Sequence, residues 1–152
     1  VCAWGPTAML PIFQLLGTDY LSKQIVTRFD NEQRNYDAFT KISFIYPHAV
    51  ASLKVGQGVK SEGEMIVSGT KGYIYVPAPW WKTDYFEVRY ENPHNNRRYF
   101  YQLDGEGLRY ELLSFLKTIR SGRDFNYVAD SMSEEIVRVL ADFYNRKDMT
   151  VI

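Results

Sequence analysis

The sequence has little cysteine, little histidine and no excess of charge of either sign, and each shortage excludes a class of protein. Cys2 is the one cysteine, so no disulfide can form within the chain. Lysine plus arginine and aspartate plus glutamate both number 18, so no net field attracts nucleic acid or an anionic membrane surface. The 2 histidines, His48 and His94, lie far apart without a companion at ligand spacing. We therefore expect neither a nucleic-acid partner nor a metal site.

Long hydrophobic runs and targeting segments are also missing. No apolar run is long enough to span a bilayer, and no signal peptide opens the sequence, so we expect a cytoplasmic protein without a membrane partner. The apolar pattern starts at Val1, as if the chain had been cut from a longer one. At 152 residues, 45% of them hydrophobic, residues 1–152 are expected to form one globular domain with its own core.

Complete catalytic and phosphate-binding motifs are absent too. Residues 56–58 (GQG) and 105–107 (GEG) resemble the start of a dinucleotide fingerprint, but the third glycine is missing from both, so turns are the favoured interpretation. No Ser-His-Asp constellation, phosphate loop or Cys-His pair can be assembled. The residues alone therefore predict a domain without a catalytic site of its own.

Short segments rich in β-branched and aromatic residues dominate the first two thirds of the chain. Alternation and turn signals predict strands over residues 22–29, 38–46, 48–55, 64–68, 73–76, 85–90 and 98–103. Residues 30–36 are expected to form a polar connection, and Pro47 to end the second strand. Because the connections are short, the strands are expected to pair in an antiparallel fashion.

The segment from Gly63 to Trp81 is the central part of this pattern of strands. We expect a tight hairpin at residues 69–72 (GTKG), formed by a type I turn that a left-handed Gly72 closes. Alternation places apolar side chains on one face of the hairpin and tyrosines on the other. The apolar face carries Met65, Val67, Ile74 and Val76, and the other face carries Tyr73 and Tyr75.

Helical periodicity predicts three helices. The first starts near Pro6 or Thr7, tolerates Pro11 and ends before Gly17. The second covers the apolar positions from Leu108 to Ile119 and stops at Gly122; the third runs from Ser131 to Tyr144, with Ser131 and Glu134 as a capping box. The fold class expected is α+β, an open, mainly antiparallel sheet of about six or seven strands with helices on one face and the other free for a partner.

Two segments have the composition of a binding surface. Trp80 and Trp81 follow a Pro-Ala-Pro turn, and adjacent indoles can stack on a sugar or a base, anchor a protein contact, or clamp the loop itself. Residues 97–101 interleave arginine with aromatic side chains as a single-strand nucleic-acid binder does, but without net positive charge a half-buried strand is favoured.

Four features together resemble a known family. They are the helix that ends in Leu15-Leu16-Gly17, the hairpin of residues 69–76, the helix of 107–122 and the last helix of 131–144. In this order and spacing they look like the C-terminal domain of the glucose-fructose oxidoreductase, inositol dehydrogenase and MocA family, over nearly the whole chain.

The resemblance implies an NAD(P)-dependent oxidoreductase that acts on a sugar, polyol or nucleotide sugar. This domain would supply the substrate side and the subunit interface, with a homo-oligomer formed through the open, tyrosine-rich sheet face. NAD or NADP would bind a preceding Rossmann domain, which also carries the family's catalytic lysine in a Glu-Lys-Pro motif. This chain contains neither, so the resemblance implies no cofactor within it and no activity for it alone.

One departure from the family's pattern lies inside the chain. The family's Asp-x-Gly-x-His, which serves substrate binding and proton transfer, falls on residues 3–7 and keeps only Gly5. Ala3 replaces the acid and Thr7 the imidazole, and a threonine hydroxyl cannot act as a base near neutral pH. We expect no catalytic residue here, and name Trp4, Thr7, Trp80 and Trp81 as substrate-binding candidates. The alternative is a binding or scaffold domain that kept the fold and lost the chemistry.

Overall fold

The computed structural model describes residues 1–30, 36–105 and 107–152. Contacts between these residues divide the chain into two compact units. The first unit is Val1–Ser61 with Val128–Ile152, and the second is Glu62–Tyr127. That residues 1–152 act as a single C-terminal domain stays a prediction.

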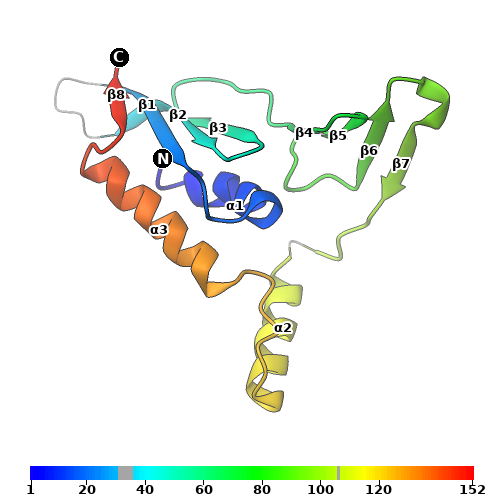
Figure 1. Ribbon diagram of the computed structural model, residues 1–152. Coiled ribbons are helices and arrows are strands. Elements are labelled where there is room, and N and C mark those ends of the chain that lie inside the picture. Colours follow the sequence, from blue (N-terminus) through cyan, green and yellow to red (C-terminus); the bar gives the residue numbers. More distant parts are fainter. Residues whose placement is uncertain (31–35, 106) are drawn as a thin grey trace. The chain divides into compact units, whose positions relative to one another are not determined.

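The first unit contains a four-stranded sheet, called sheet A, and two helices (Figure 1). Its strands are β1 (Ser22–Phe29), β2 (Asp37–Ile45), β3 (Val50–Gly56) and β8 (Met149–Val151), in the order β3-β2-β1-β8. The helices are α1 (Gly5–Leu16) and α3 (Asp130–Tyr144). The strands β1, β2 and β3 pair antiparallel, as their short connections predict, whereas β8 pairs parallel to β1.

The core of the first unit lies between sheet A and the two helices, which lie on the same side of the sheet in Figure 1. Alternation along the strands sends one set of side chains into this core. Its members include Met9 and Phe13 of α1, Ile25, Ile42, Phe44 and Leu53 of the sheet, and Val139 and Phe143 of α3. The other face of the sheet is open and carries polar side chains such as Gln24, Lys41 and Lys54.

An ion-pair cluster also ties α3 to sheet A. The Lys23 ammonium on β1, whose side chain is 4% exposed, pairs with Asp142 near the end of α3 and with Asp148 before β8. Nearby, the Tyr20 hydroxyl donates to Glu135 Oε1 at 2.6 Å. Burial and the Glu135 carboxylate raise the pKa of Tyr20. These buried polar groups therefore have partners, as burial requires.

The first helix ends at Leu16, before Gly17, as predicted, and starts at Gly5, one residue before the predicted start near Pro6 or Thr7. Proline stands in its first turn, where a missing N–H costs nothing, and Pro11 is accommodated inside it. Gly17 follows with a φ of 77°, and its N–H donates to the Phe13 carbonyl at 2.9 Å. The Tyr46 hydroxyl then donates to the Gly17 carbonyl at 2.8 Å, which fixes this helix end to strand β2.

The third helix starts differently from the prediction. Its first residue is Asp130, its N-cap is Ala129, and no side chain makes a cap hydrogen bond. Ser131 therefore lies inside the first turn, so the predicted Ser131–Glu134 capping box is wrong. A capping box needs its serine at the N-cap, and that position is occupied here by Ala129.

The second unit contains sheet B, a short 3₁₀ helix (η1, Pro93–Asn95) and α2 (Leu108–Ser121). Strands β4 (Met65–Ser68), β5 (Gly72–Val76), β6 (Tyr85–Tyr90) and β7 (Arg97–Phe100) form an antiparallel meander. As predicted, Met65 pairs with Val76 and Val67 with Ile74, which places these apolar residues on one face. Tyr73 and Tyr75 occupy the other.

The hairpin prediction is correct in position and wrong in the role of Gly72. Gly72 does not have a positive φ and is the first residue of β5. A Cβ added there would clash with the Arg89 carbonyl oxygen of the paired strand. Gly72 is therefore required by close approach of β6, rather than by a left-handed turn.

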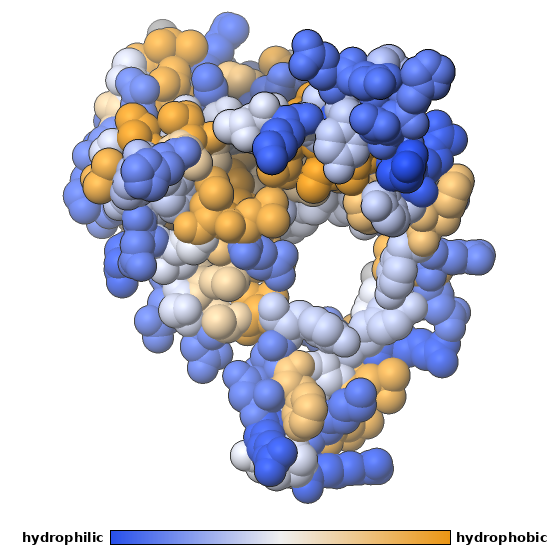
Figure 2. Space-filling model, turned by 45° about the vertical axis from the view of Figure 1, so that its right-hand side comes forward, coloured by the Kyte–Doolittle hydropathy of each residue, from blue (hydrophilic) through white to orange (hydrophobic). Residues whose placement is uncertain are grey.

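The helix α2 ends at Gly122, with a φ of 66°, as its stop signal predicts. Its large apolar side chains, among them Leu108, Leu112, Phe115 and Ile119, are exposed, and Figure 2 shows hydrophobic surface on this helix.

The α+β class and the mainly antiparallel pairing are confirmed. In the part of the chain that the structure describes, the strands number eight over the two sheets. Within the described ranges, no helix has both the length and the apolar character needed to cross a membrane.

Candidate functional site

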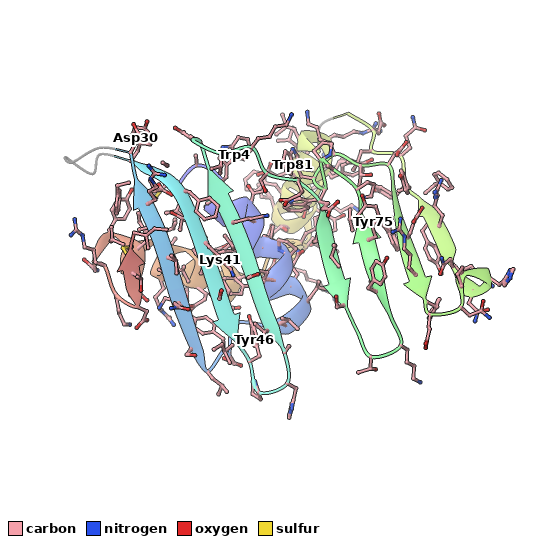
Figure 3. The ribbon with its side chains drawn as sticks, turned by 90° about the horizontal axis from the view of Figure 1, so that it is seen from above. Trp4, Asp30, Lys41, Tyr46, Tyr75 and Trp81 are labelled. Atoms are coloured by element: carbon pink, nitrogen blue, oxygen red, sulfur yellow. The ribbon has the colours of Figure 1, made fainter. Side chains whose placement is uncertain are left out.

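A pocket of about 380 Å³ lies in the first unit, at one end of sheet A. Because β1, β2 and β3 pair antiparallel, the end of β1, the start of β2 and the end of β3 lie at the same end of the sheet. The first residues of the chain and the end of α3 complete the wall of the pocket. It is lined by Val1, Cys2, Ala3, Trp4, Phe29, Tyr36, Asp37, Val55, Gly56, Gln57, Phe143, Tyr144 and Arg146. Figure 3 shows Trp4 and Asp30 at this end of sheet A and Tyr46 at the opposite end.

The turn before α1 shapes one wall. The Gly5 N–H donates to the Val1 carbonyl at 2.6 Å, so residues 1–4 fold back over the helix start. A Cβ at Gly5 would lie 2.9 Å from a Val1 methyl carbon. The glycine of the pentad is thus needed for packing, and it brings Ala3 and Trp4 to the pocket.

The pocket combines aromatic walls with a few hydrogen-bonding groups. Phe29, Phe143 and Trp4 supply aromatic surface, while Asp37, Gln57 and Arg146 supply a carboxylate, an amide and a guanidinium. A pocket with apolar walls and few polar groups is the usual form of a small-molecule site. The carboxylate and the amide of the pocket can form hydrogen bonds with hydroxyl groups of a ligand, and the aromatic walls can pack against the faces of a ligand ring.

The end of α3 presents a phenol and a guanidinium to the pocket. The Cys2 sulfur lies 3.1 Å from the Tyr144 hydroxyl, and this hydrogen bond raises the pKa of Tyr144. Arg146 has a φ of 56°, in the left-handed region, and its N–H donates to the Phe143 carbonyl at 3.1 Å. The chain therefore turns sharply at Arg146, directly after the helix.

The predicted substrate residues are divided between the two units. Trp4 lines the pocket and its side chain is 53% exposed, whereas Thr7 is exposed on α1 and is not among the lining residues. Trp80 and Trp81 belong to the second unit, where their rings meet edge to face at 5.8 Å. The Trp80 N–H donates to the Gly63 carbonyl at 2.9 Å, which fixes the loop. Substrate binding by these four residues stays a prediction.

Sequence reasoning missed most of the pocket's polar residues. Asp37, Gln57, Tyr144 and Arg146 come from three separate parts of the chain, and none belongs to a motif. The nearest signal was the pair of glycines at 56–58, which points to a position where two backbone segments approach each other.

The glycines at 56 and 58 do not fit a phosphate cradle. A Cβ at Gly56 would lie 2.5 Å from the Ala38 carbonyl oxygen, and one at Gly58 would lie 3.3 Å from the Ala38 Cβ. Both glycines therefore make room for the neighbouring strand β2, and these residues are not suited to hold a dinucleotide cofactor. The histidines, cysteine and carboxylates that the structure describes form no group able to hold a metal ion.

Sheet B carries a second candidate surface, the tyrosine face, formed by Tyr73, Tyr75, Tyr85, Glu87, Arg89 and Arg98. Glu87 accepts hydrogen bonds from Arg89 Nε at 2.6 Å and Arg98 Nε at 2.8 Å. The Arg89 guanidinium lies 4.4 Å from the Tyr75 ring centre. Hydrogen bonds from Arg89 and Arg98 lower the pKa of Glu87. The face is thus an ordered ionic and aromatic surface.

Solved structures of oxidoreductases share this fold. KijD10, a 3-ketoreductase from Actinomadura kijaniata solved with NADP and TDP-benzene, is similar over 97% of this chain with a TM-score of 0.73 and 12% identity. Aldose-aldose oxidoreductase from Caulobacter crescentus, solved with glycerol, matches 93% of the chain with a TM-score of 0.72 and 17% identity. An oxidoreductase from Bacillus cereus matches 94% with a TM-score of 0.70 and 16% identity.

The match covers less than half of each of these proteins. The chain spans 46% of KijD10, 43% of the Caulobacter enzyme and 48% of the Bacillus cereus protein. No family model matches the sequence, and no curated protein matches it either. The fold that the sequence resemblance implied is therefore confirmed by likeness of structure.

Proposed function

We propose that this chain is the substrate-binding and oligomerisation domain of an NAD(P)-dependent oxidoreductase of the glucose-fructose oxidoreductase, inositol dehydrogenase and MocA family. Its substrate is a sugar, a polyol or a nucleotide sugar. The observation that carries the proposal is the fold likeness over 97% of the chain to a 3-ketoreductase solved with NADP and a TDP compound. The glycerol complex of a second relative agrees with a polyol-type ligand.

The cofactor would bind outside these residues. Gly56 and Gly58 serve strand packing, and the chain spans less than half of its structural relatives, so NAD or NADP is assigned to a preceding Rossmann domain. When bound there, the cofactor supplies hydride transfer to or from the substrate carbon.

The residues of this chain would bind and orient the substrate. Trp4, Phe29 and Phe143 can pack against a sugar ring, and Asp37 and Gln57 can bond its hydroxyl groups. Ala3 and Thr7 offer no carboxylate or imidazole for proton transfer, so these two positions are not proposed to supply the proton acceptor. The chain alone is therefore expected to be inactive.

Cofactor binding by the full-length protein tests this proposal. Titration with NAD and with NADP, followed by fluorescence or calorimetry, is expected to show saturable binding of at least one of them. Binding of neither would contradict the proposal, whatever the pocket binds.

Ala3 and Thr7 favour a second candidate function, a binding or scaffold domain that kept the fold without the reaction. The chain segment that precedes Val1 in the full-length protein discriminates between the two. A strand followed by G-x-G-x-x-G, with a later Glu-Lys-Pro, supports the oxidoreductase, and their absence supports the scaffold.

The tyrosine face is the proposed surface for a homo-oligomer. Its planar aromatic and guanidinium groups are residue types that protein interfaces favour. Light scattering over a dilution series of the full-length protein is expected to show a stable dimer or tetramer. A monomer at all concentrations would contradict this part of the proposal alone.

A further inference from the structure

The carboxylate of Asp37 is held at the wall of the pocket in sheet A. Its side chain is 12% exposed and lines the pocket together with Ala3 and Trp4. The Thr40 hydroxyl donates to Asp37 Oδ2 at 2.6 Å, and the Val1 ammonium pairs with both carboxylate oxygens. A carboxylate has about four acceptor positions, so these three hydrogen bonds leave about one position for a ligand.

A β-bulge turns Asp37 toward this pocket. In the regular part of the ladder Arg28 pairs with Phe39, but the next pair is Phe29 with Asp37, so Ala38 is skipped. Strict alternation would place Asp37 on the sheet face opposite to Thr40, because the two positions differ by an odd number. The bulge reverses this, and Thr40 reaches Asp37. Bulges are common next to functional sites, where they redirect a side chain.

The two glycines of residues 56–58 accommodate this bulge. The Gly58 N–H donates to the carbonyl of the skipped residue, Ala38, at 3.1 Å. A side chain at Gly56 would collide with that same carbonyl oxygen. The bulge and the two glycines therefore act together to position the Asp37 side chain.

Buried hydroxyls extend the arrangement into the core. Thr27 and Thr40 are opposite each other on β1 and β2, are both 0% exposed, and their hydroxyl oxygens lie 2.8 Å apart. Because the Thr40 hydrogen is donated to Asp37, the Thr27 hydroxyl donates to Thr40, and the Phe39 carbonyl oxygen lies 3.2 Å from the same Thr27 oxygen. Valine would fill the same volume without burying a hydroxyl. The hydroxyl pair therefore serves to fix the Asp37 carboxylate before a ligand arrives.

We propose that Asp37 binds a hydroxyl group of a sugar or polyol in this pocket, and that Thr40 acts as its positioning residue. The inference rests on the proposed function for the class of ligand and adds the residue that selects it. A carboxylate accepts strong, charge-assisted hydrogen bonds from hydroxyl groups and disfavours an anionic group at the same position. The ligand group that contacts Asp37 is thus a hydroxyl group.

Ligand-observed NMR on the full-length protein tests the role of Asp37, with 1,5-anhydro-D-glucitol as the probe and tetrahydropyran, which lacks the hydroxyl groups, as the comparison. The wild-type protein is expected to bind the first and not the second. Asp37→Asn is expected to weaken binding about tenfold, because a charge-assisted hydrogen bond is replaced by a neutral one. Asp19→Asn, the same change at an exposed position outside the pocket, is expected to have no effect.

Two results would overturn the inference. One is a wild-type protein that does not bind the probe, and the other is an Asp37→Asn protein that binds it as well as the wild type does. Failure to bind NAD or NADP would instead overturn the oxidoreductase proposal and leave the polyol site in place, so the two failures are distinguishable.

Substitutions of Thr40 separate positioning from folding. Thr40→Val keeps the shape and removes the donor, so it is expected to weaken probe binding severalfold, and Thr40→Ser is expected to restore it. Melting temperatures of both variants control for stability. If valine and serine give equal probe affinity, Thr40 does not position the carboxylate and that half of the inference is withdrawn.

Discussion

At the scale of single residues, the pair of Lys23 and Asp142 is the interaction whose loss is expected to cost most. The Lys23 side chain is 4% exposed and that of Asp142 12%. Removing Lys23 leaves the Asp142 carboxylate with Lys147 alone, whose ammonium lies 3.6 Å away and whose side chain is 63% exposed. Breaking a buried pair in this way costs about 3–5 kcal/mol. Lys23→Met is therefore expected to lower the free energy of unfolding by about 3 kcal/mol in denaturant titrations.

Lys41→Met is the matched control, because Lys41 is exposed on the opposite face of the same sheet (Figure 3). A surface change of this kind is expected to alter the free energy of unfolding by less than about 0.5 kcal/mol. Equal losses for the two variants would show that the buried pair does not stabilise the first unit.

The same pair predicts a dependence of stability on pH. Burial alone raises the pKa of Asp142, but the hydrogen bond and charge of Lys23 outweigh it, so the pKa is lowered overall. A lowered pKa in the folded state stabilises the protein above the unfolded value of about 3.9 and loses this effect as pH falls through the folded value. The stability difference between wild type and Lys23→Met is expected to shrink below pH of about 4. A difference that stays constant in unfolding curves from neutral to acid pH would contradict the assignment.

Gly72 allows a similar test in sheet B. A Cβ there would clash with the Arg89 carbonyl, whereas a Cβ at Gly69 meets its nearest atom at 3.4 Å, an ordinary contact. Gly72→Ala is expected to destabilise the protein by about 1–3 kcal/mol, because β5 and β6 must separate. Gly69→Ala in the same hairpin is the control. Thermal unfolding that ranks the two variants in the reverse order would contradict this explanation of Gly72.

Single residues also show where the sequence is informative. The hairpin glycines are visible in the sequence, but the reason for Gly72 depends on the backbone of β6, which no local pattern displays. The role of Asp37 cannot be predicted from the sequence for the same reason, because the orientation of its side chain depends on a bulge opposite Phe29. Local chemistry predicts where a turn lies, whereas contacts between strands decide which way a side chain points.

At the scale of elements, hydrophobic periodicity was sufficient to predict the three α-helices and seven of the eight strands among the described residues. It failed for β8, which is Met149–Val151 and too short to show alternation. Such a short strand forms because β1 has backbone groups free to pair with it along one side. The Ile25 N–H donates to the Asp148 carbonyl at 2.8 Å, and the Ile152 N–H donates to the Thr27 carbonyl at 2.9 Å. The capping box failed because α3 begins at Asp130, so that Ala129 and not Ser131 occupies the N-cap.

Removing β8 is expected to expose the edge of β1. A chain that ends at Asp148 leaves backbone groups of β1 unpaired, and an open edge promotes association. We expect a lower melting temperature and light scattering that rises with protein concentration. Ile152→Ala, which keeps the backbone donor, is the control, and a truncated chain as stable and as monodisperse as this variant would contradict the role of β8.

At the scale of the whole molecule, the family resemblance predicted the fold that the solved oxidoreductases share, although the identities are 12–17%. A fold survives such divergence because it depends on the pattern of apolar positions more than on their identity. The pocket does not follow from that pattern, because its polar residues come from distant segments that only the folded chain brings together. Function therefore depends on the site and not on the fold.

Restoring the family's pentad in the full-length protein tests whether the reaction was lost or moved. Ala3→Asp with Thr7→His returns a carboxylate and an imidazole to the start of α1, where Ala3 already lines the pocket. If the protein is an oxidoreductase weakened by these two positions, the double variant is expected to raise kcat about a hundredfold, the usual contribution of a positioned acid or base. Its pH profile should also gain a limb near the histidine pKa of about 6.5. Ala3→Asn with Thr7→Gln can form hydrogen bonds but cannot take up a proton near neutral pH, so it is expected to change neither. A double variant with unchanged kcat and pH profile would mean that proton transfer is supplied by another domain, or that the chain binds its ligand without transforming it.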